Sequence, residues 1–388
     1  MDIKVGNYVI VKRQAYTKLL KLKEKGTITL GNFIIETENI IGEKYGVTFR
    51  MVSKTKKLYC LEKVEQINNT INIESSGTDN RNITDDGTSQ TLTSDEINKL
   101  KDESLVSSEI VGKLISSSTS FNSKTEYSQE KYIKKKERKY FEYIQFLKPT
   151  IRLLIEMYYR QDSAKILGLR DDYLSQIITY GNIQSTGNYL LYDSGTSGLV
   201  PAMILNAIGK ETEGKLIHMH PGNECQKSAV LAMQFPKEQQ DRLINVNLYS
   251  VLRCFYQEKE SYLVDEVPKK LVRTEDGPKK PGWHNDNERA CRILTDKVDG
   301  VIITCKENPM SIVKELIQFL KHSRSIVVYH LYREPLQELF IYLKGTCDFI
   351  SIRLLENFMR KYQVLPDRTH PEVNMTLGGY VLTGLKIS

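Results

Sequence analysis

The residues with the clearest chemical potential form a short turn, Tyr192–Gly198 (YDSGTSG), between an apolar run and a helical pattern. Turns of this kind hold nucleotide-like cofactors, because glycines let the backbone approach a ligand without a Cβ in the way. Asp193, Gly195 and Gly198 fit that use. Ser197 stands where the middle glycine would be wanted, so the turn alone neither indicates nor excludes a cofactor.

The next apolar run lacks the acid that such a cofactor needs. A carboxylate at its end normally binds ribose hydroxyls, whereas this run ends in His218-Met219-His220-Pro221-Gly222, and Glu224 lies beyond the turn. Loss of a charge-assisted hydrogen bond of this kind costs about 1.5 to 3 kcal/mol, or roughly a ten- to hundredfold loss of affinity. His218, His220 and Cys225 do not predict a metal site, since no second pair follows at the spacing of zinc ligands.

The fourth apolar run, 299–304, should end in the group that acts on a substrate. It ends in Thr304, Cys305 and Lys306, without a carboxylate. A serine hydrolase is excluded as well, because Ser194 lacks the G-x-S-x-G surroundings of a nucleophile elbow. The sequence therefore predicts a degenerate cofactor pocket. Its candidate residues are Asp193, Gly195, Ser197, Gly198, His220 and Thr304.

From residue 187 to residue 388, strand-like and helix-like patterns alternate. Such alternation predicts a mainly parallel sheet with helices on both faces. The runs 349–355 and 380–386, separated by a long loop, predict an antiparallel hairpin at the sheet edge, and 268–285, which holds Trp283, predicts an exposed insertion. The expected strands are 189–192, 215–219, 243–246, 301–304 and 325–330, and the expected helices are 199–208, 287–294, 310–320 and 335–343.

Three segments precede this domain. Residues 1–67 contain short apolar runs separated by turns with glycine and asparagine, which predicts a small antiparallel, barrel-like β-domain. Residues 68–126 are rich in Ser, Thr, Asn and Asp and hold one aromatic residue, Phe121, so we expect an acidic disordered linker that buries too little apolar area to fold. Residues 127–186 predict a basic helix, which turns apolar before Pro149, and a helical connector.

Composition favours a polyanion as the partner. The net charge is +7, but the linker holds ten acidic and five basic residues, so the rest of the chain carries +12. Such a charge favours nucleic acid, and simple solubility explains it equally well. Six cysteines without a C-x-x-C pair predict neither a zinc ribbon nor a disulfide framework and fit a reducing compartment. No apolar run approaches the roughly 20 residues of a membrane span, so we expect no membrane partner.

Three stretches of the sequence carry a family resemblance. They are 127–152, which begins YSQEKYIKKKERKY, then 168–184, which begins GLRDDYLSQ, and 362–371 (YQVLPDRTHP) with Gly378-Gly379-Tyr380. These stretches resemble the non-catalytic subunit of the eukaryotic tRNA (adenine-N1)-methyltransferase, which modifies adenine 58 of the T-loop. The likeness covers nearly the whole chain except the linker.

The resemblance implies an α/β protein: a Rossmann-like class I methyltransferase fold with a degenerate cofactor site, preceded by a small N-terminal β-barrel. It implies no cofactor in this chain, because the catalytic partner subunit binds S-adenosylmethionine, and a heterotetramer with two copies of each subunit. In the catalytic copy an aspartate ends the fourth strand, and Thr304 takes that position here. The expected partners are that subunit and tRNA, and the expected location is the nucleus, with the cytoplasm as a second place.

The target adenine lies within folded tRNA and must be exposed, so the enzyme has to grip the RNA from several sides. Basic residues of the first and third domains and of the final loop are the candidates for phosphate contacts. From charge alone, a solvated helix face or a nuclear localisation signal explains the lysine run equally well. The candidate tRNA-binding residues are Lys12, Arg13, Lys131, Lys134, Lys135, Lys136, Arg138, Lys139, Arg360, Lys361, Arg368 and His370.

Two other functions are compatible with the residues. One is a stand-alone, active S-adenosylmethionine-dependent RNA methyltransferase, because Asp193 is present and Ser197 alone would not forbid the cofactor. Methylation of tRNA by the purified chain would favour it. The other is an RNA-binding factor, for example in translation, without an enzymatic partner. A methyltransferase chain that co-purifies in equal amounts would exclude it.

Overall fold

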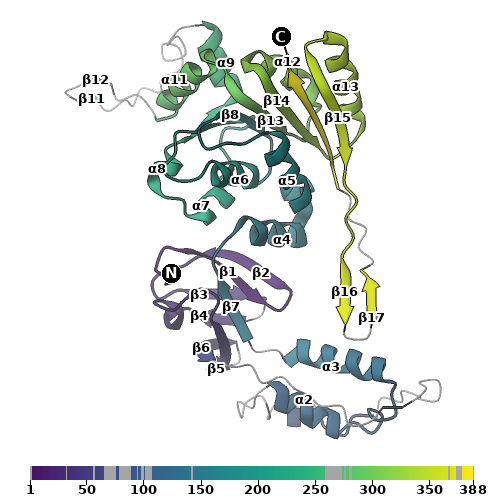
Figure 1. Ribbon diagram of the computed structural model, residues 1–388. Helices are drawn as coiled ribbons and strands as arrows, with labels where there is room; N and C mark the ends of the chain where they lie inside the picture. The colour runs from purple at the N-terminus through teal and green to yellow at the C-terminus, as the bar shows by residue number, and fades with distance from the viewer. Residues whose placement is uncertain are drawn as a thin grey trace. The chain divides into compact units, whose positions relative to one another are not determined.

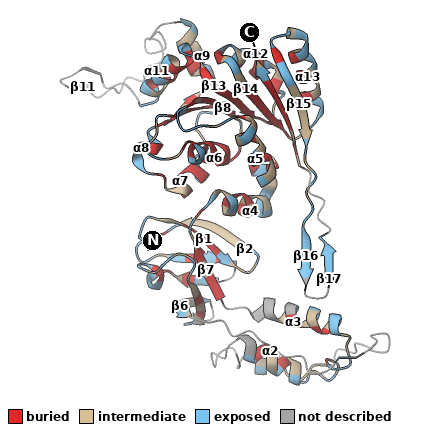
Figure 2. Ribbon diagram, in the orientation of Figure 1, coloured by how far each residue is buried: buried red, intermediate tan, exposed pale blue. Residues whose placement is uncertain are grey.

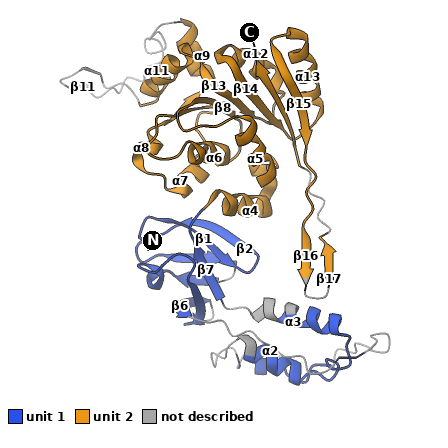
Figure 3. Ribbon diagram, viewed as in Figure 1, with its two compact units in different colours: residues 1–149 blue, residues 150–388 orange. Residues whose placement is uncertain are grey.

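The computed structural model divides into two compact units, residues 1–149 and residues 150–388 (Figures 1 and 3). Each unit is described by itself. The structure describes residues 2–31, 33–55, 57–64, 76–77, 89–93, 95–97, 100, 107–140, 143–257, 273–274, 277–278, 282–365, 368–372 and 378–387.

Unit 1 is built on a seven-stranded sheet with the order β2-β1-β7-β5-β6-β4-β3. A strand forms at each of the apolar runs in the first 64 residues, and glycines lie in the turns between β2 and β3 (Gly26) and between β3 and β4 (Gly31). Phe49 and Phe146 meet edge to face in its core, with ring centroids 5.7 Å apart. The strands are β1 (Tyr8–Arg13), β2 (Tyr16–Lys21), β3 (Thr27–Leu30), β4 (Phe33–Glu36), β5 (Thr48–Ser53), β6 (Leu58–Val64) and β7 (Tyr143–Leu147), and the 3₁₀ helix η1 (Glu38–Ile40) follows β4.

The predicted closed barrel is not confirmed, because the sheet forms a half-barrel with two open ends. Among the described residues no strand pairing joins the end strands β2 and β3. One side chain links them, since the Lys18 ammonium donates to the Thr29 carbonyl oxygen at 3.0 Å. Lys21 and Lys23 line the cavity beside this contact.

The prediction of a continuous helix up to Pro149 is wrong for residues 143–147. These residues form β7, which pairs with β1 and β5, for example Ile10 with Leu147 and Phe49 with Ile144. Tyr143, Ile144 and Phe146 are buried there. Pairing with strands about 100 residues away outweighs the local helical pattern, because aromatic and β-branched residues pack well on a half-buried sheet.

The prediction of disorder is wrong for residues 107–126. Helix α2 (Ser107–Ser116) buries Ile110, Val111 and Leu114, and Phe121 is buried edge-on to Tyr132 of helix α3 (Glu126–Tyr140). A few apolar side chains on one face are enough to pair two helices, which an average over the linker composition conceals. Most of the linker before residue 107 lies outside the described residues.

Unit 2 confirms the predicted α/β architecture. Its seven-stranded sheet has the order β10-β9-β8-β13-β14-β18-β15, in which the first five strands are parallel and β18 is antiparallel to both neighbours. Helices lie on both faces, and the strands between them are the buried layer (Figure 2). The strands are β8 (Asn188–Asp193), β9 (Lys215–His220), β10 (Leu243–Asn247), β13 (Val298–Thr304), β14 (Leu320–His330), β15 (Phe349–Glu356) and β18 (Tyr380–Lys386).

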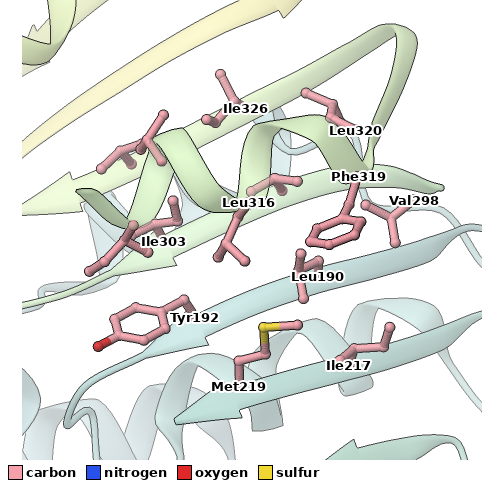
Figure 4. Close-up of a cluster of buried hydrophobic side chains, with 14 of the residues drawn as sticks. Leu190, Tyr192, Ile217, Met219, Val298, Ile303, Leu316, Phe319, Leu320 and Ile326 are labelled. Carbon is pink, nitrogen blue, oxygen red and sulfur yellow. The ribbon is translucent and has the colours of Figure 1, made fainter. Parts of the chain in front are cut away.

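One face of this sheet carries a large apolar core. Leu190, Ile217 and Ile303 project from neighbouring strands toward Leu316 and Phe319 (Figure 4). The helices of unit 2 are α4 (Ile151–Asp162), α5 (Asp171–Tyr180), α6 (Leu199–Ile208), α7 (Ser228–Met233), α8 (Lys237–Gln240), α9 (Leu248–Gln257), α11 (Gly282–Thr295), α12 (Pro309–Leu316) and α13 (Glu334–Thr346), with 3₁₀ helices η2 (Ser163–Ile166) and η3 (Ile317–Phe319).

Two predicted segments of unit 2 need correction or refinement. The predicted edge hairpin is present, since β15 and β18 pair, but their connection forms a second hairpin of β16 (Tyr362–Leu365) and β17 (Arg368–Pro371). The predicted insertion 268–285 is wrong at its end, because helix α11 starts at Gly282 and includes Trp283. Within that insertion, only β11 (Arg273–Thr274) and β12 (Gly277–Pro278) are described before α11.

The long hairpin connection is fixed at both ends by one side-chain cluster on α5. At the first end, the Asn357 carbonyl accepts from Arg170 Nη2 at 2.8 Å, and Gln176 Nε2 donates to the Asn357 side chain at 2.7 Å. At the other end, Gly378 and Gly379 pack so closely that an added Cβ would lie 2.6 Å from Arg170 and 2.5 Å from Tyr329. Arg170 stays in place through a paired bond to Asp172.

We predict that Gly379→Ala lowers the unfolding free energy by about 1 to 3 kcal/mol, the cost of overpacking a core. The Tyr329 ring cannot move away easily, because it is fully buried and its hydroxyl donates to the Leu167 carbonyl. Chemical denaturation measures the change. The control is Gly345→Ala, where a Cβ meets nothing within 4 Å, so its stability should stay the same or rise. Equal stabilities of the two variants would contradict this packing.

Candidate functional site

The parallel strands of unit 2 bring the predicted pocket residues to one edge of the sheet. Asp193, His220 and Thr304 end β8, β9 and β13, and Thr304 is in register with Asp193. Side chains at the carboxyl ends of parallel strands face the same crevice, which is where α/β proteins bind ligands. The structure thus places these three residues together at one edge of the sheet.

The Asp193 carboxylate accepts hydrogen bonds mainly from its own turn. Its Oδ1 accepts from the backbone N–H of Gly195 and of Thr196, both at 3.0 Å, and from the Thr304 hydroxyl at 3.3 Å. Its Oδ2 accepts from the Thr196 hydroxyl at 2.5 Å. A carboxylate offers about four acceptor positions, two on each oxygen, so these bonds fill Oδ1 and leave one position on Oδ2. Asp193 is buried and holds the turn together.

Ser197 adopts a conformation that favours glycine, with φ of 55°. Its backbone N–H donates to Gln226 Oε1 at 2.7 Å, and its hydroxyl donates to the Lys165 carbonyl at 2.9 Å. These bonds offset the strain of a left-handed backbone, which costs about 1 kcal/mol. The N–H that a glycine-rich turn would direct at a ligand is thus bonded to a side chain of this chain. At position 198 only glycine fits, because a Cβ there would lie 2.8 Å from the Gln226 carbonyl oxygen.

His218 lies two residues before the end of β9, in a buried polar cluster. His218 Nδ1, Cys225 Sγ and Asn245 Oδ1 are each 3.1 Å from the other two. Burial lowers the pKa of His218, against the opposing effect of the Asp193 carboxylate 3.8 Å away. Burial also raises the pKa of the Cys225 thiol to about 12, so the thiol stays protonated and is not an activated nucleophile.

His220 and Thr304 also lack the chemistry of a cofactor and catalytic site. His220 is buried, and burial lowers its pKa, so the imidazole is neutral where a ribose-binding carboxylate would be charged. The Thr304 hydroxyl lies against Asp193 and the Tyr192 carbonyl and cannot accept a proton as a base. Burial raises the pKa of Cys305 to about 12. In the part of the chain that the structure describes, no three His, Cys, Asp or Glu side chains are placed to hold a metal ion.

The predicted tRNA-binding residues lie on three separate elements. Helix α3 carries the lysine run, with Lys131 and Lys135 exposed and the Lys136 ammonium 5.1 Å from the centre of the Tyr132 ring. On β1, Lys12 is exposed, whereas Arg13 is half-buried over Phe33. The side chains that lie outside the described residues are those of Lys134, Arg138, Lys139 and Arg368.

The third element is the β16–β17 hairpin with the residues that lead into it. Arg360 lies 5.5 Å from the centre of the Phe358 ring, and Lys361 and His370 are exposed. Burial lowers the pKa of the Arg13 guanidinium on β1, which lies over the Phe33 ring. The remaining described cations are accessible for phosphates.

Sequence reasoning missed two residues that decide the geometry of the site. Gln226 lies in the β9–α7 loop, and no motif indicates that its amide reaches back to the first turn. Asn357 follows β15 directly and connects the sheet edge to α5. The stretch 168–184 gave a partial signal for Asn357, because its Arg170, Tyr173 and Gln176 form that connection.

The family of the chain follows from comparison with known sequences. The sequence profile of the Gcd10p family matches residues 2–277, which is most of the chain. The chain belongs to the Gcd10p family. No helix in the described part of this Gcd10p-family chain is long and apolar enough to cross a membrane.

Relatives of this Gcd10p-family chain match over nearly its whole length. A mouse protein is 32% identical over 98% of this chain and 88% of its own length, and it is named tRNA (adenine(58)-N(1))-methyltransferase non-catalytic subunit TRM6. A Dictyostelium discoideum protein with the corresponding name is 30% identical over 100% of this chain and 80% of its own length.

Solved structures show the fold of the Gcd10p-family chain. A SAM-dependent O-methyltransferase from Thermotoga maritima has a TM-score of 0.52 at 12% identity, covering 100% of this chain and 95% of its own. The tRNA (m1A58) methyltransferase TrmI from Aquifex aeolicus has a TM-score of 0.50 at 11% identity, covering 100% of both chains. The chain therefore has the Rossmann-like fold of these methyltransferases.

We predict that Asp193→Ala destabilises the chain by about 3 kcal/mol in the absence of any ligand. The loss leaves the buried N–H of Thr196 and the half-buried N–H of Gly195 without acceptors, and each orphaned buried donor costs about 1 to 3 kcal/mol. Thermal and chemical denaturation measure it. The control, Asp241→Ala, removes an exposed carboxylate and should change stability by less than about 0.5 kcal/mol. An unchanged stability for Asp193→Ala would mean that this carboxylate serves a ligand instead.

Proposed function

We propose that this chain is the non-catalytic subunit of a tRNA (adenine(58)-N(1))-methyltransferase, which binds and positions tRNA for a catalytic partner. The observation that carries the proposal is the filled turn, in which polar groups that a cofactor would need are bonded within the chain. The Asp193 carboxylate accepts from N–H groups of the turn, the Ser197 N–H donates to Gln226, and the Ser197 hydroxyl donates to the Lys165 carbonyl. The names of the mouse and Dictyostelium relatives, which match over most of their length, support it.

We propose further that this chain binds no S-adenosylmethionine and that the partner subunit supplies it. The residues do not fit the cofactor in two further places. Neutral His220 stands at the strand end where a carboxylate would bind ribose hydroxyls, at a cost of about 1.5 to 3 kcal/mol. Thr304 stands where the catalytic aspartate of the active subunit would lie, and it is bonded to Asp193. A stand-alone methyltransferase would need both groups.

The role that remains for the chain is to bind RNA. Exposed cations on α3, on β1 and directly before the β16–β17 hairpin, which include Lys131, Lys135 and Lys361, provide phosphate contacts. A target base inside folded tRNA has to be unstacked, and firm contacts to the surrounding RNA offset that cost. We propose a heterotetramer with two copies of each subunit and a nuclear location, with the cytoplasm as a second place.

The lysine run on α3 tests this function. We predict that the triple variant Lys134→Ala, Lys135→Ala and Lys136→Ala, in the complex with the catalytic subunit, weakens tRNA binding and lowers the salt slope of log Kd by about 2 to 3 units, because each lost phosphate contact removes about 0.7 to 0.9 of a unit. Filter binding over a range of salt concentrations measures both. S-adenosylmethionine binding by the complex should not change.

The control variant replaces three exposed lysines of unit 2 by alanine, so that it loses the same charge. These lysines are Lys210, Lys237 and Lys344. We expect a small, non-specific loss of affinity from this control and a larger one from the α3 variant. Equal affinities and salt slopes for the two variants would contradict the role of α3. Methylation of tRNA by the purified chain alone would contradict the function as a whole.

A further inference from the structure

Above the filled turn, one buried histidine connects two loops of the sheet edge. His330 ends β14 and is buried. The Tyr332 backbone N–H donates to its Nδ1 at 3.0 Å, and its Nε2 lies 3.4 Å from the Lys306 carbonyl oxygen. The tautomer with hydrogen on Nε2 therefore bonds to both loops at once. The backbones of Lys306 and Tyr332 are held beside the same imidazole ring.

The first turn is joined to these loops as well. The Lys306 backbone N–H donates to the Ser194 hydroxyl at 3.0 Å, and the Ser194 N–H donates to the Thr304 carbonyl at 3.0 Å. The ends of β8, β13 and β14 thus form one hydrogen-bonded unit. A rigid backbone lowers the entropy that its exposed side chains lose when they bind a ligand.

The side chains on this unit are an aromatic ring and a cation. Tyr332 is 61% exposed, and Lys306 is exposed. In the described part of the chain neither the Lys306 ammonium nor the Tyr332 hydroxyl has a hydrogen-bond or ion-pair partner. Lys227, also exposed, lowers the pKa values of His218 and His220, although burial lowers them more. The first carboxylate after Lys306 in the sequence is Glu307, which is half-buried, and the first after Tyr332 is Glu334.

The edge continues with the same chemistry at β15. This strand runs parallel to β14, because β18 is antiparallel to both, so Phe358 follows its end at the same edge of the sheet. Phe358 is 84% exposed, and Arg360 lies against its ring. Asn357, bonded to α5, fixes the position where this second aromatic and cation pair starts.

We propose that the loops after β13 and β14 form a docking site for an unpaired nucleotide of RNA. The base stacks on the Tyr332 ring, and the Lys306 ammonium pairs with the adjacent phosphate. This inference rests on the proposed function for the identity of the RNA as tRNA. An exposed aromatic ring beside a cation is the usual platform for single-stranded nucleic acid, and stacking needs a base whose face is not already covered.

Free nucleotides and RNA share this chemistry, but the site favours RNA. The groups below it, Asp193 and the N–H of Ser197, are bonded within the chain and leave no pocket chemistry for a ribose or a methionine group. Binding energy must then come from the surface, where a single base and phosphate contribute little alone. Attachment to a larger RNA that is held elsewhere raises the effective concentration of the nucleotide at the site.

The test uses the complex with the catalytic subunit and a tRNA transcript. We expect Tyr332→Ala to weaken tRNA binding about tenfold, the range for the loss of one base stack, and Tyr332→Phe to stay within about twofold, because stacking needs only the ring. Lys306→Ala should lower the salt slope by about one unit. The controls are Tyr256→Ala and Lys344→Ala, which lie in the last turns of α9 and α13, away from the carboxyl ends of the strands, and should leave affinity within about twofold.

A direct readout separates stacking from indirect effects. In the Tyr332→Trp variant, the difference in tryptophan fluorescence from the unsubstituted complex should be quenched by tRNA and not by AMP at the same concentration. Quenching by AMP at equal concentration would overturn the proposal in favour of a free-nucleotide site. An unchanged tRNA affinity in Tyr332→Ala would also overturn it, and if the α3 triple variant weakens binding at the same time, the proposed function still stands.

Discussion

The four hydrogen bonds accepted by the Asp193 carboxylate are the interaction on which the site depends. A buried carboxylate that accepts from the N–H groups of its own turn stabilises that turn, and it cannot rotate outward without leaving those donors unpaired. Ser197 and Gln226 extend the same principle to the backbone of the turn. In this way the chain keeps the shape of a cofactor-binding turn while its polar groups serve the fold, which is consistent with a subunit that contributes binding surface.

A second constraint joins the fold to its surface. Arg170, Tyr173 and Gln176 on α5 hold Asn357, and close packing of Gly378 and Gly379 against Arg170 and Tyr329 holds the return of the chain. The long connection between β15 and β18 is therefore fixed at both ends. The exposed residues Lys361 and Tyr362 follow shortly after the fixed end at Asn357. Of the sequence stretches that carry the family resemblance, two are explained by this anchoring.

The sequence was enough to predict the helices and strands whose patterns are local and strong. Helix 199–208 matches α6 residue for residue, the strand end at Thr304 was placed correctly, and the end of β8 was placed one residue early, at Tyr192, because buried parallel strands appear as continuous apolar runs. Residues 143–147 became a strand through partners far away in sequence, and 107–116 became a helix through a few apolar contacts that composition hides. Gln226 could not be predicted, since a single long-range side-chain bond leaves no periodic pattern in the sequence.

We propose that this sheet edge has no binding capacity for S-adenosylmethionine. A calorimetric titration of S-adenosylmethionine into the purified chain, run beside the same titration of the complex with the catalytic subunit, tests it most directly. We expect saturable binding by the complex and, for the chain alone, no saturation at concentrations up to about 1 mM. Saturable binding to the isolated chain at micromolar concentrations would contradict the account, because it would require Asp193 and the N–H of Ser197 to be available to a ligand.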